Sequence, residues 1–80
     1  MTDGEPLAKQ ANMRRFVLVR TEDVTGTSGT GIVAEGVELS SGHVVLTWLS
    51  ALQSFAIYDN AKVLERLHGH QGRTRIAWID

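Results

Sequence analysis

Cysteine is absent from this chain, so neither a disulfide nor a thiolate zinc site can stabilise it. The absence fits a reducing compartment, and we expect the protein to be cytoplasmic. No apolar run approaches the length of a membrane span. The first residues also lack the basic start and apolar stretch of a secretory signal. We therefore expect no membrane partner.

Neither sign of charge is in excess. Eight Lys and Arg residues against nine Asp and Glu residues give a formal charge of −1. Nucleic-acid binders usually gather a basic excess on one face, so this balance argues against DNA or RNA as a partner. With 42% hydrophobic residues in a chain of 80, the composition is that of one small folded domain.

Proline occurs once, at Pro6, within a first dozen residues that show little apolar periodicity. Such a segment has no apolar side to pack on a core. We predict a mobile tail over residues 1–12 and a single small β-rich domain over residues 13–80, beginning at Met13.

Five apolar segments show the patterns of β-strands. They are residues 16–19, 32–39, 43–49, 54–58 and 74–79. The first is a continuous apolar run, which favours a central strand covered on both faces. Gly36, inside the second, indicates a bulge or a close approach by another backbone. The Ser40–Gly42 segment predicts a hairpin between the second and third. The fourth is short and suits an edge, whereas the large apolar residues of the last favour a place inside the sheet.

One helix is predicted over residues 60–68. Asp59 suits its N-cap, and Gly69 suits the left-handed residue that ends it. Ala61, Leu64 and Leu67 form its apolar stripe. The fold class is therefore α+β, mainly β. Two architectures fit: a small five-stranded antiparallel sheet, or a barrel resembling the Src-homology-3 type, each with one short helix before the last strand.

A glycine-rich loop over residues 21–31 contains Gly29-Thr-Gly31-Ile-Val-Ala34, which has the form GxGxxA. In a dinucleotide-binding fold this motif opens a helix, but here a strand pattern follows it. The plain interpretation is a loop that enters a strand. The alternative is an anion nest of backbone amides, with Arg20 or Arg73 supplying positive charge.

His68 and His70 flank Gly69 and could share one metal ion if the segment were extended, with His43 or Asp59 as a conceivable third ligand. Only two ligands are indicated, and His68 also suits a helix C-terminus as a cation. We therefore expect no metal. Tyr58, at the end of the short fourth strand, is the aromatic residue that we expect to be partly exposed.

No catalytic set is evident. Ser28 has Gly26 before it, but Thr30 occupies the second glycine position of the GxSxG elbow. A chain this short also has little room for a base, an oxyanion hole and a cleft. We expect no enzyme activity, no catalytic residue and no cofactor.

Three stretches of the chain resemble a group of short, uncharacterised proteins from actinobacteria, haloarchaea and their phages. The stretches are FVLVRTEDVTGTSGTGIVAEGVELSSGHVVLTWL, SFAIYDN and LHGHQGRTRIAWID, which together cover most of residues 16–80. The resemblance implies a phage origin but brings no activity with it.

Two functions follow from these observations. The first is a non-enzymatic protein-interaction module, phage-encoded, that acts on a host protein or pairs with its own copy through an edge strand. The alternative is a small-ligand domain that binds phosphate, a nucleotide or a metal with the Gly26–Gly31 loop and the His68–Arg73 segment. The candidate binding residues are Gly29, Gly31, Tyr58, His68, His70 and Arg73.

Overall fold

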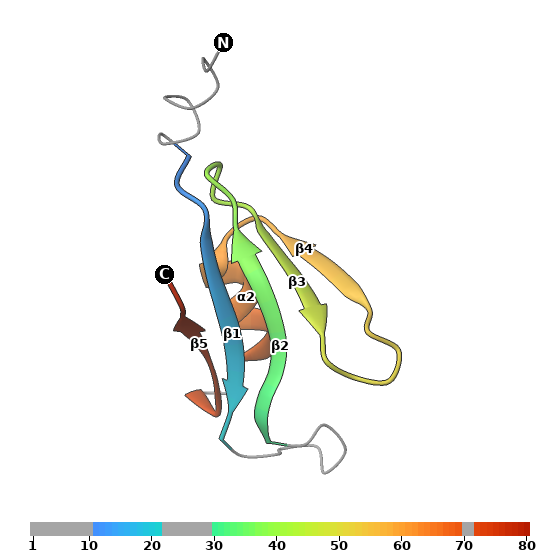
Figure 1. The fold of residues 1–80 in the computed structure, drawn as a ribbon. Helices are drawn as coiled ribbons and strands as arrows, with labels where there is room; N and C mark the ends of the chain where they lie inside the picture. Colours follow the sequence, from blue (N-terminus) through green and yellow to red (C-terminus); the bar gives the residue numbers. More distant parts are fainter. Residues whose placement is uncertain (1–10, 22–29, 70–71) are drawn as a thin grey trace.

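The computed structural model describes residues 11–21, 30–69 and 72–80. Most of the predicted tail and most of the predicted loop 21–31 lie outside these ranges. Among the described residues, five strands form one antiparallel sheet and one helix precedes the last strand (Figure 1). The elements are β1 (Arg14–Arg20), β2 (Gly31–Glu38), β3 (Val44–Trp48), β4 (Phe55–Tyr58), α2 (Ala61–His68) and β5 (Thr74–Trp78).

The sheet is open, with the strand order β4-β3-β2-β1-β5. The five-stranded antiparallel sheet is therefore the correct architecture, and the barrel alternative is not formed because β4 and β5 do not pair. The prediction that residues 54–58 form an edge strand is confirmed. The prediction that the last strand lies inside the sheet is wrong. Because the meander β1 to β4 occupies the interior of the sheet, β5 can join only at an edge, and it pairs with the outer side of β1.

The hairpin between β2 and β3 forms at the predicted place. Gly42 has φ of 96°, a left-handed conformation that glycine adopts without steric cost. Its N–H donates to Leu39 O at 2.8 Å, and the Leu39 N–H donates to His43 O at 2.8 Å. These two bonds close the turn and set the β2–β3 register, in which Gly36 lies opposite Leu46.

The helix begins one residue later than predicted. Asn60, not Asp59, is the N-cap: its backbone is extended and its side-chain oxygen accepts from the Val63 N–H at 2.9 Å. Leu64 is completely buried, but Leu67 is 59% exposed, so the predicted stripe contacts the core only at its start. Gly69 is not the predicted left-handed residue: its φ is −71°, and its N–H donates to Glu65 O at 2.7 Å, which continues the helical pattern. Gly72, with φ of 92°, is left-handed.

The core lies between α2 and one face of the sheet. Its buried members are Phe16, Leu18, Ala34, Val44, Leu46 and Leu64. A register shift between Leu18 and Val19 lets Val33 pack on this core beside Ala34, which simple alternation did not predict. Because α2 has only eight residues, its stability must come from this packing rather than from helix propensity.

Gly36 permits the close packing at the centre of the sheet. A Cβ atom there would lie 2.5 Å from the carbonyl oxygen of Val45 and 2.6 Å from Cζ of Phe16. The ring of Phe16 therefore occupies the space that a side chain on β2 would fill. The predicted close approach is confirmed, whereas the bulge lies elsewhere, at the register shift in β1 and β2.

Candidate functional site

Two of the candidate binding residues lie on the helix side of the sheet. The Tyr58 hydroxyl and His68 Nε2 are 2.9 Å apart and share a hydrogen bond. The ring of His68 also makes an edge contact with Trp48, at 5.0 Å between centroids. Partial burial raises the pKa of Tyr58. This geometry ties the end of α2 to β3 and β4, and it gives His68 a structural contact. Gly29 and His70 lie outside the described residues.

Gly31 and Arg73 lie at one end of the sheet, on either side of the end of β1. Arg20 pairs with Gly31 on one side and with Thr74 on the other. The carbonyl oxygen of Arg73 accepts from the Thr21 N–H at 2.7 Å. The buried guanidinium of Arg20 donates to Thr74 Oγ1 at 3.0 Å. The described ends of the two glycine-containing segments are therefore neighbours.

Metal ligands do not gather in the part of the chain that the structure describes. No three His, Cys, Asp or Glu side chains there are placed to hold one ion. His43 contacts Ser41, with Nδ1 and Oγ 2.8 Å apart, in the β2–β3 hairpin. That hairpin lies at the other end of the sheet from the end of β1, where Gly31 and Thr74 lie (Figure 1).

The face of the sheet that points away from α2 is the most unusual surface of the described chain, and we call it the open face. Sheet alternation places on it the residues that do not join the core. Its apolar side chains are Val17, Val19, Val37, Val45, Phe55, Ile57, Ala77 and Ile79, and its polar ones are Arg15, Glu35, Thr47 and Arg75. None of these residues is buried, and no described helix or strand packs over them.

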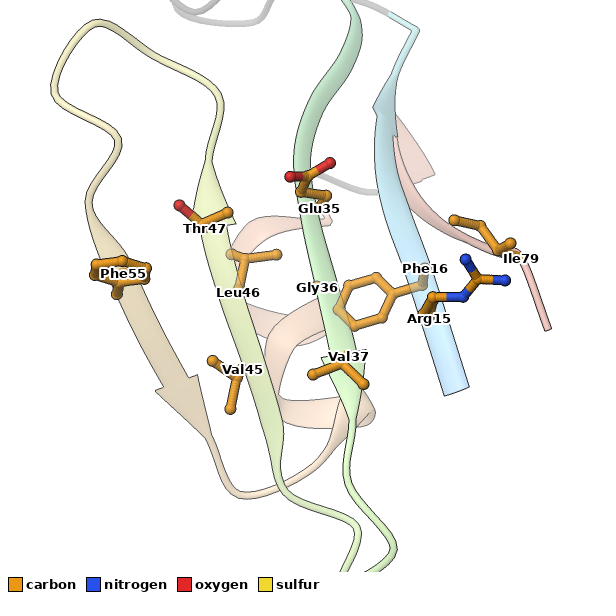
Figure 2. A pocket seen from close by; sticks show the side chains of 10 residues that line it. All are labelled: Arg15, Phe16, Glu35, Gly36, Val37, Val45, Leu46, Thr47, Phe55 and Ile79. Carbon is orange, nitrogen blue, oxygen red and sulfur yellow. The ribbon is translucent and has the colours of Figure 1, made fainter. Parts of the chain in front are cut away.

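A shallow depression of about 400 Å³ crosses the open face (Figure 2). It extends across the strands from Ile79, just beyond β5, to Phe55 on β4, with Val37 and Val45 between them. Phe55 is 81% exposed and Ile79 is 56% exposed. Soluble proteins seldom leave a contiguous apolar surface of this kind uncovered unless something binds there.

Charge on the open face is placed at its centre and at one side. Glu35 lies between Val17 and Thr47 of the neighbouring strands and is exposed, and its carboxylate forms no hydrogen bond or ion pair with any described residue. At the side, both side-chain oxygens of Asp80 accept from the Arg15 guanidinium, at 2.8 and 3.0 Å. These bonds lower the pKa of Asp80 to about 2 and raise the pKa of Arg15. The carboxylate of Glu35 is thus available to a cation from outside.

The sequence reasoning did not identify the open face, although the signal was present. The run Phe16-Val-Leu-Val19 is apolar at every position, which predicts a strand covered on both faces. In the structure β1 is paired on both edges, as predicted, but the described chain covers only the side that bears Phe16 and Leu18. The side chains of Val17 and Val19, on the other face of β1, are therefore not covered by the described chain.

Comparison with known proteins gives one match. A family model described as Acb5 phage protein matches residues 13–80. No curated protein and no solved structure matches the chain. Within the described residues, no helix has the length and apolar character that crossing a membrane requires. The match confirms the phage association that the resemblance implied, whereas the distribution among actinobacteria and haloarchaea stays a prediction. Because the match spans most of the sequence, the chain belongs to the Acb5 phage protein family.

Proposed function

We propose that this phage protein is a non-enzymatic module that binds a host protein in the cytoplasm through the open face of its sheet. The single observation that supports the proposal is the uncovered apolar surface that extends from Ile79 to Phe55. Apolar area removed from water contributes about 25 cal/mol per Å², so covering this face would supply much of the free energy of binding.

The chemistry of the surface specifies the partner. Domains are built from packed layers, and helices on both faces of a sheet are one of the stable arrangements. The partner we propose is therefore an amphipathic helix of the host protein. Its apolar stripe would lie against Val37 and Val45, and a Lys or Arg side chain on it would meet the carboxylate of Glu35.

The experiment is affinity capture from a lysate of the phage's host, followed by calorimetry with the purified partner. Val37→Glu places a charge in the centre of the depression, and Glu35→Lys reverses the central charge. We expect each variant to weaken binding about tenfold or more, the second mainly at low salt. Leu67→Glu is the matched control, because Leu67 is also exposed and apolar but lies on α2. The control should bind as the wild type does.

A photo-crosslinking amino acid separates the open face from other surfaces. Placed at residue 37, it should form a covalent adduct with the partner, and placed at residue 67 it should not. If Val37→Glu binds as tightly as the wild type, or if crosslinks form only from residue 67, the open face is not the binding surface. A wild-type protein that binds no host protein overturns the proposal as a whole.

One observation favours a second candidate function. Gly31 and Thr74 lie on either side of Arg20, so the described ends of the glycine-rich loop and of the segment before β5 are neighbours at one end of the sheet. A small anionic ligand, such as phosphate or a nucleotide, would meet the charge of Arg20 and the backbone amides of this end. An NMR titration with phosphate, nucleotides and zinc tests this candidate. Shifts at Gly31, Arg73 and Thr74 would support it, and unchanged signals there would remove it.

A further inference from the structure

The outer edge of β4 is unpaired in the described chain. β4 pairs with β3 alone and is the first strand in the sheet order, and Figure 1 shows no described element beyond it. The Trp48 N–H donates to Ser54 O at 3.0 Å, which makes Trp48 and Ser54 a hydrogen-bonded pair of the antiparallel ladder. Such pairs alternate, so Ala56 also directs its backbone groups to β3. Phe55 and Ile57 therefore direct their N–H and C=O groups to the outside.

Nothing on β4 opposes pairing with another strand. Natural edge strands are usually protected by a charged side chain, a proline or a bulge, and the sequence Phe55-Ala-Ile-Tyr58 has none of these. The side chains of Phe55 and Ile57 are 81% and 71% exposed. The opposite edge differs: β5 carries Arg75, and its Trp78 ring is covered by the guanidinium of Arg14 at 3.8 Å.

We propose that two copies of the chain pair through β4, antiparallel, about a two-fold axis at Ala56. In this register Phe55 lies opposite Ile57 of the second copy, and Ile57 lies opposite its Phe55. Both are outward-facing positions, so each becomes a hydrogen-bonded pair that exchanges two N–H···O bonds. All of the outward backbone groups of β4 then have partners, and the two sheets join into one.

The strand is self-complementary in this register alone. An axis at Phe55 would place Ile57 opposite Gln53, whose φ of 47° is not that of a strand. An axis at Ile57 would place Phe55 opposite Asp59, which lies beyond the end of β4. A shift by one residue would set outward-facing residues against inward-facing ones and break the ladder. Only the axis at Ala56 sets both outward-facing residues, Phe55 and Ile57, opposite residues of the strand.

The side chains of β4 also favour the register with the axis at Ala56. Directly opposite residues bring their Cβ atoms to about 5 Å, and aromatic residues opposite β-branched residues form favourable cross-strand pairs. Phe55 would meet Ile57 of the second copy twice, on the open face. On the helix side the two copies of Ala56 would be opposite each other, and their methyl groups leave room for the close approach that a non-hydrogen-bonded pair requires.

This pairing does not depend on the proposed host partner, because its hydrogen bonds form at the edge of the sheet. Of the open face it involves only Phe55 and Ile57. A second copy is the occupant that the strand itself specifies. A strand from a different protein is the competing occupant, and it predicts that the purified chain alone stays monomeric.

Sedimentation velocity of the full chain tests the proposal across a wide range of concentration. We expect the mass to rise with concentration from 8.8 kDa to twice that value. Ile57→Pro removes an outward N–H without removing a bond to β3, so it should abolish the dimer while the circular dichroism spectrum is kept. Phe55→Lys is a second variant with the same expected loss. Leu67→Lys, the matched exposed residue on α2, should dimerise as the wild type does.

Amide exchange by NMR adds a readout at single residues. The amides of Phe55 and Ile57 should become protected as the concentration rises, whereas the amide of Ala56 is bonded to β3 at every concentration. A chain that stays monomeric overturns the proposal. A dimer that survives both folded variants, or protection that appears at β5 instead, also overturns it. Val37→Glu separates the two proposals, since it should abolish host binding and leave the dimer intact.

Discussion

Replacing Gly36 by alanine should destabilise the domain by an amount that the structure allows us to estimate. The added Cβ would lie 2.5 Å from the backbone oxygen of Val45 and 2.6 Å from the ring of Phe16. Neither neighbour can yield at low cost, because one is strand backbone and the other is completely buried. Overpacking of this kind costs about 1–3 kcal/mol. The smaller entropy of the unfolded alanine chain offsets about 0.4–1 kcal/mol of that cost.

The expected net loss is therefore about 1–2 kcal/mol. That loss is a large part of the roughly 4–12 kcal/mol expected for a chain of this length. Urea unfolding followed by circular dichroism measures it. The midpoint should fall by about 1 M while the slope stays constant, since the area exposed on unfolding does not change.

A double-mutant cycle tests whether the ring of Phe16 is the cause. Phe16→Leu removes the ring atoms nearest to the new methyl group, so Gly36→Ala should cost less in that background, by about 0.5 kcal/mol or more. The contact with Val45 remains, and recovery should be partial. If Gly36→Ala changes stability by less than about 0.5 kcal/mol in the wild-type background, the packing argument is wrong.

Three further predictions concern the helix cap, the C-terminal ion pair and the end of α2. Asn60→Ala should cost about 1 kcal/mol in urea unfolding because it removes the acceptor for the first turn, whereas Asp59→Ala should cost less than about 0.5 kcal/mol. The carboxyl of Asp80 should titrate near pH 2 by NMR, and Arg15→Gln should return its pKa toward the usual 3.8. Because that pKa is depressed on folding, its contribution to stability is complete above about pH 4 and is lost as the pH falls toward 2. Tyr58→Phe should cost about 1 kcal/mol, and an unchanged melting curve would contradict the hydrogen bond at the end of α2.

Local sequence patterns predicted nearly all of the secondary structure. Strand alternation and β-branched residues identified each strand, and Gly42 placed the hairpin, because these signals act between near neighbours. The predicted N-cap, Asp59, was wrong by one residue. Asp and Asn both suit this position, so the residue types could not show that Asn60 is the N-cap.

The position of the last strand could not be predicted from its own residues. Its alternation of large apolar residues is the same at an edge and in the middle of a sheet. Which side of which strand it joins depends on the path of α2 across the sheet, and that path is set by the burial of Leu64. The placement is therefore a property of tertiary packing.

The open face shows the same division between local pattern and tertiary structure. An apolar run such as Phe16–Val19 predicts a strand covered on both faces. The chain itself supplies a cover for only one of those faces. A second molecule could cover the other face, and the uncovered side chains of Val17 and Val19 are one reason why we propose a partner there.

The sequence does not show which residues of β4 direct their backbone groups to the outside. If the backbone groups of Phe55 and Ile57 were directed to β3, they would be paired within the sheet. Ala56 would then direct its backbone groups to the outside. The β3–β4 connection decides between these two cases, because Gln53 turns with a positive φ and Ser54 enters the ladder opposite Trp48. The resulting hydrogen-bonding pattern leaves the backbone groups of Phe55 and Ile57 unpaired, and these two residues also have the most exposed side chains of β4. In the proposed dimer, Phe55 and Ile57 therefore supply both the backbone hydrogen bonds and the apolar contacts. Replacing either residue should abolish the dimer.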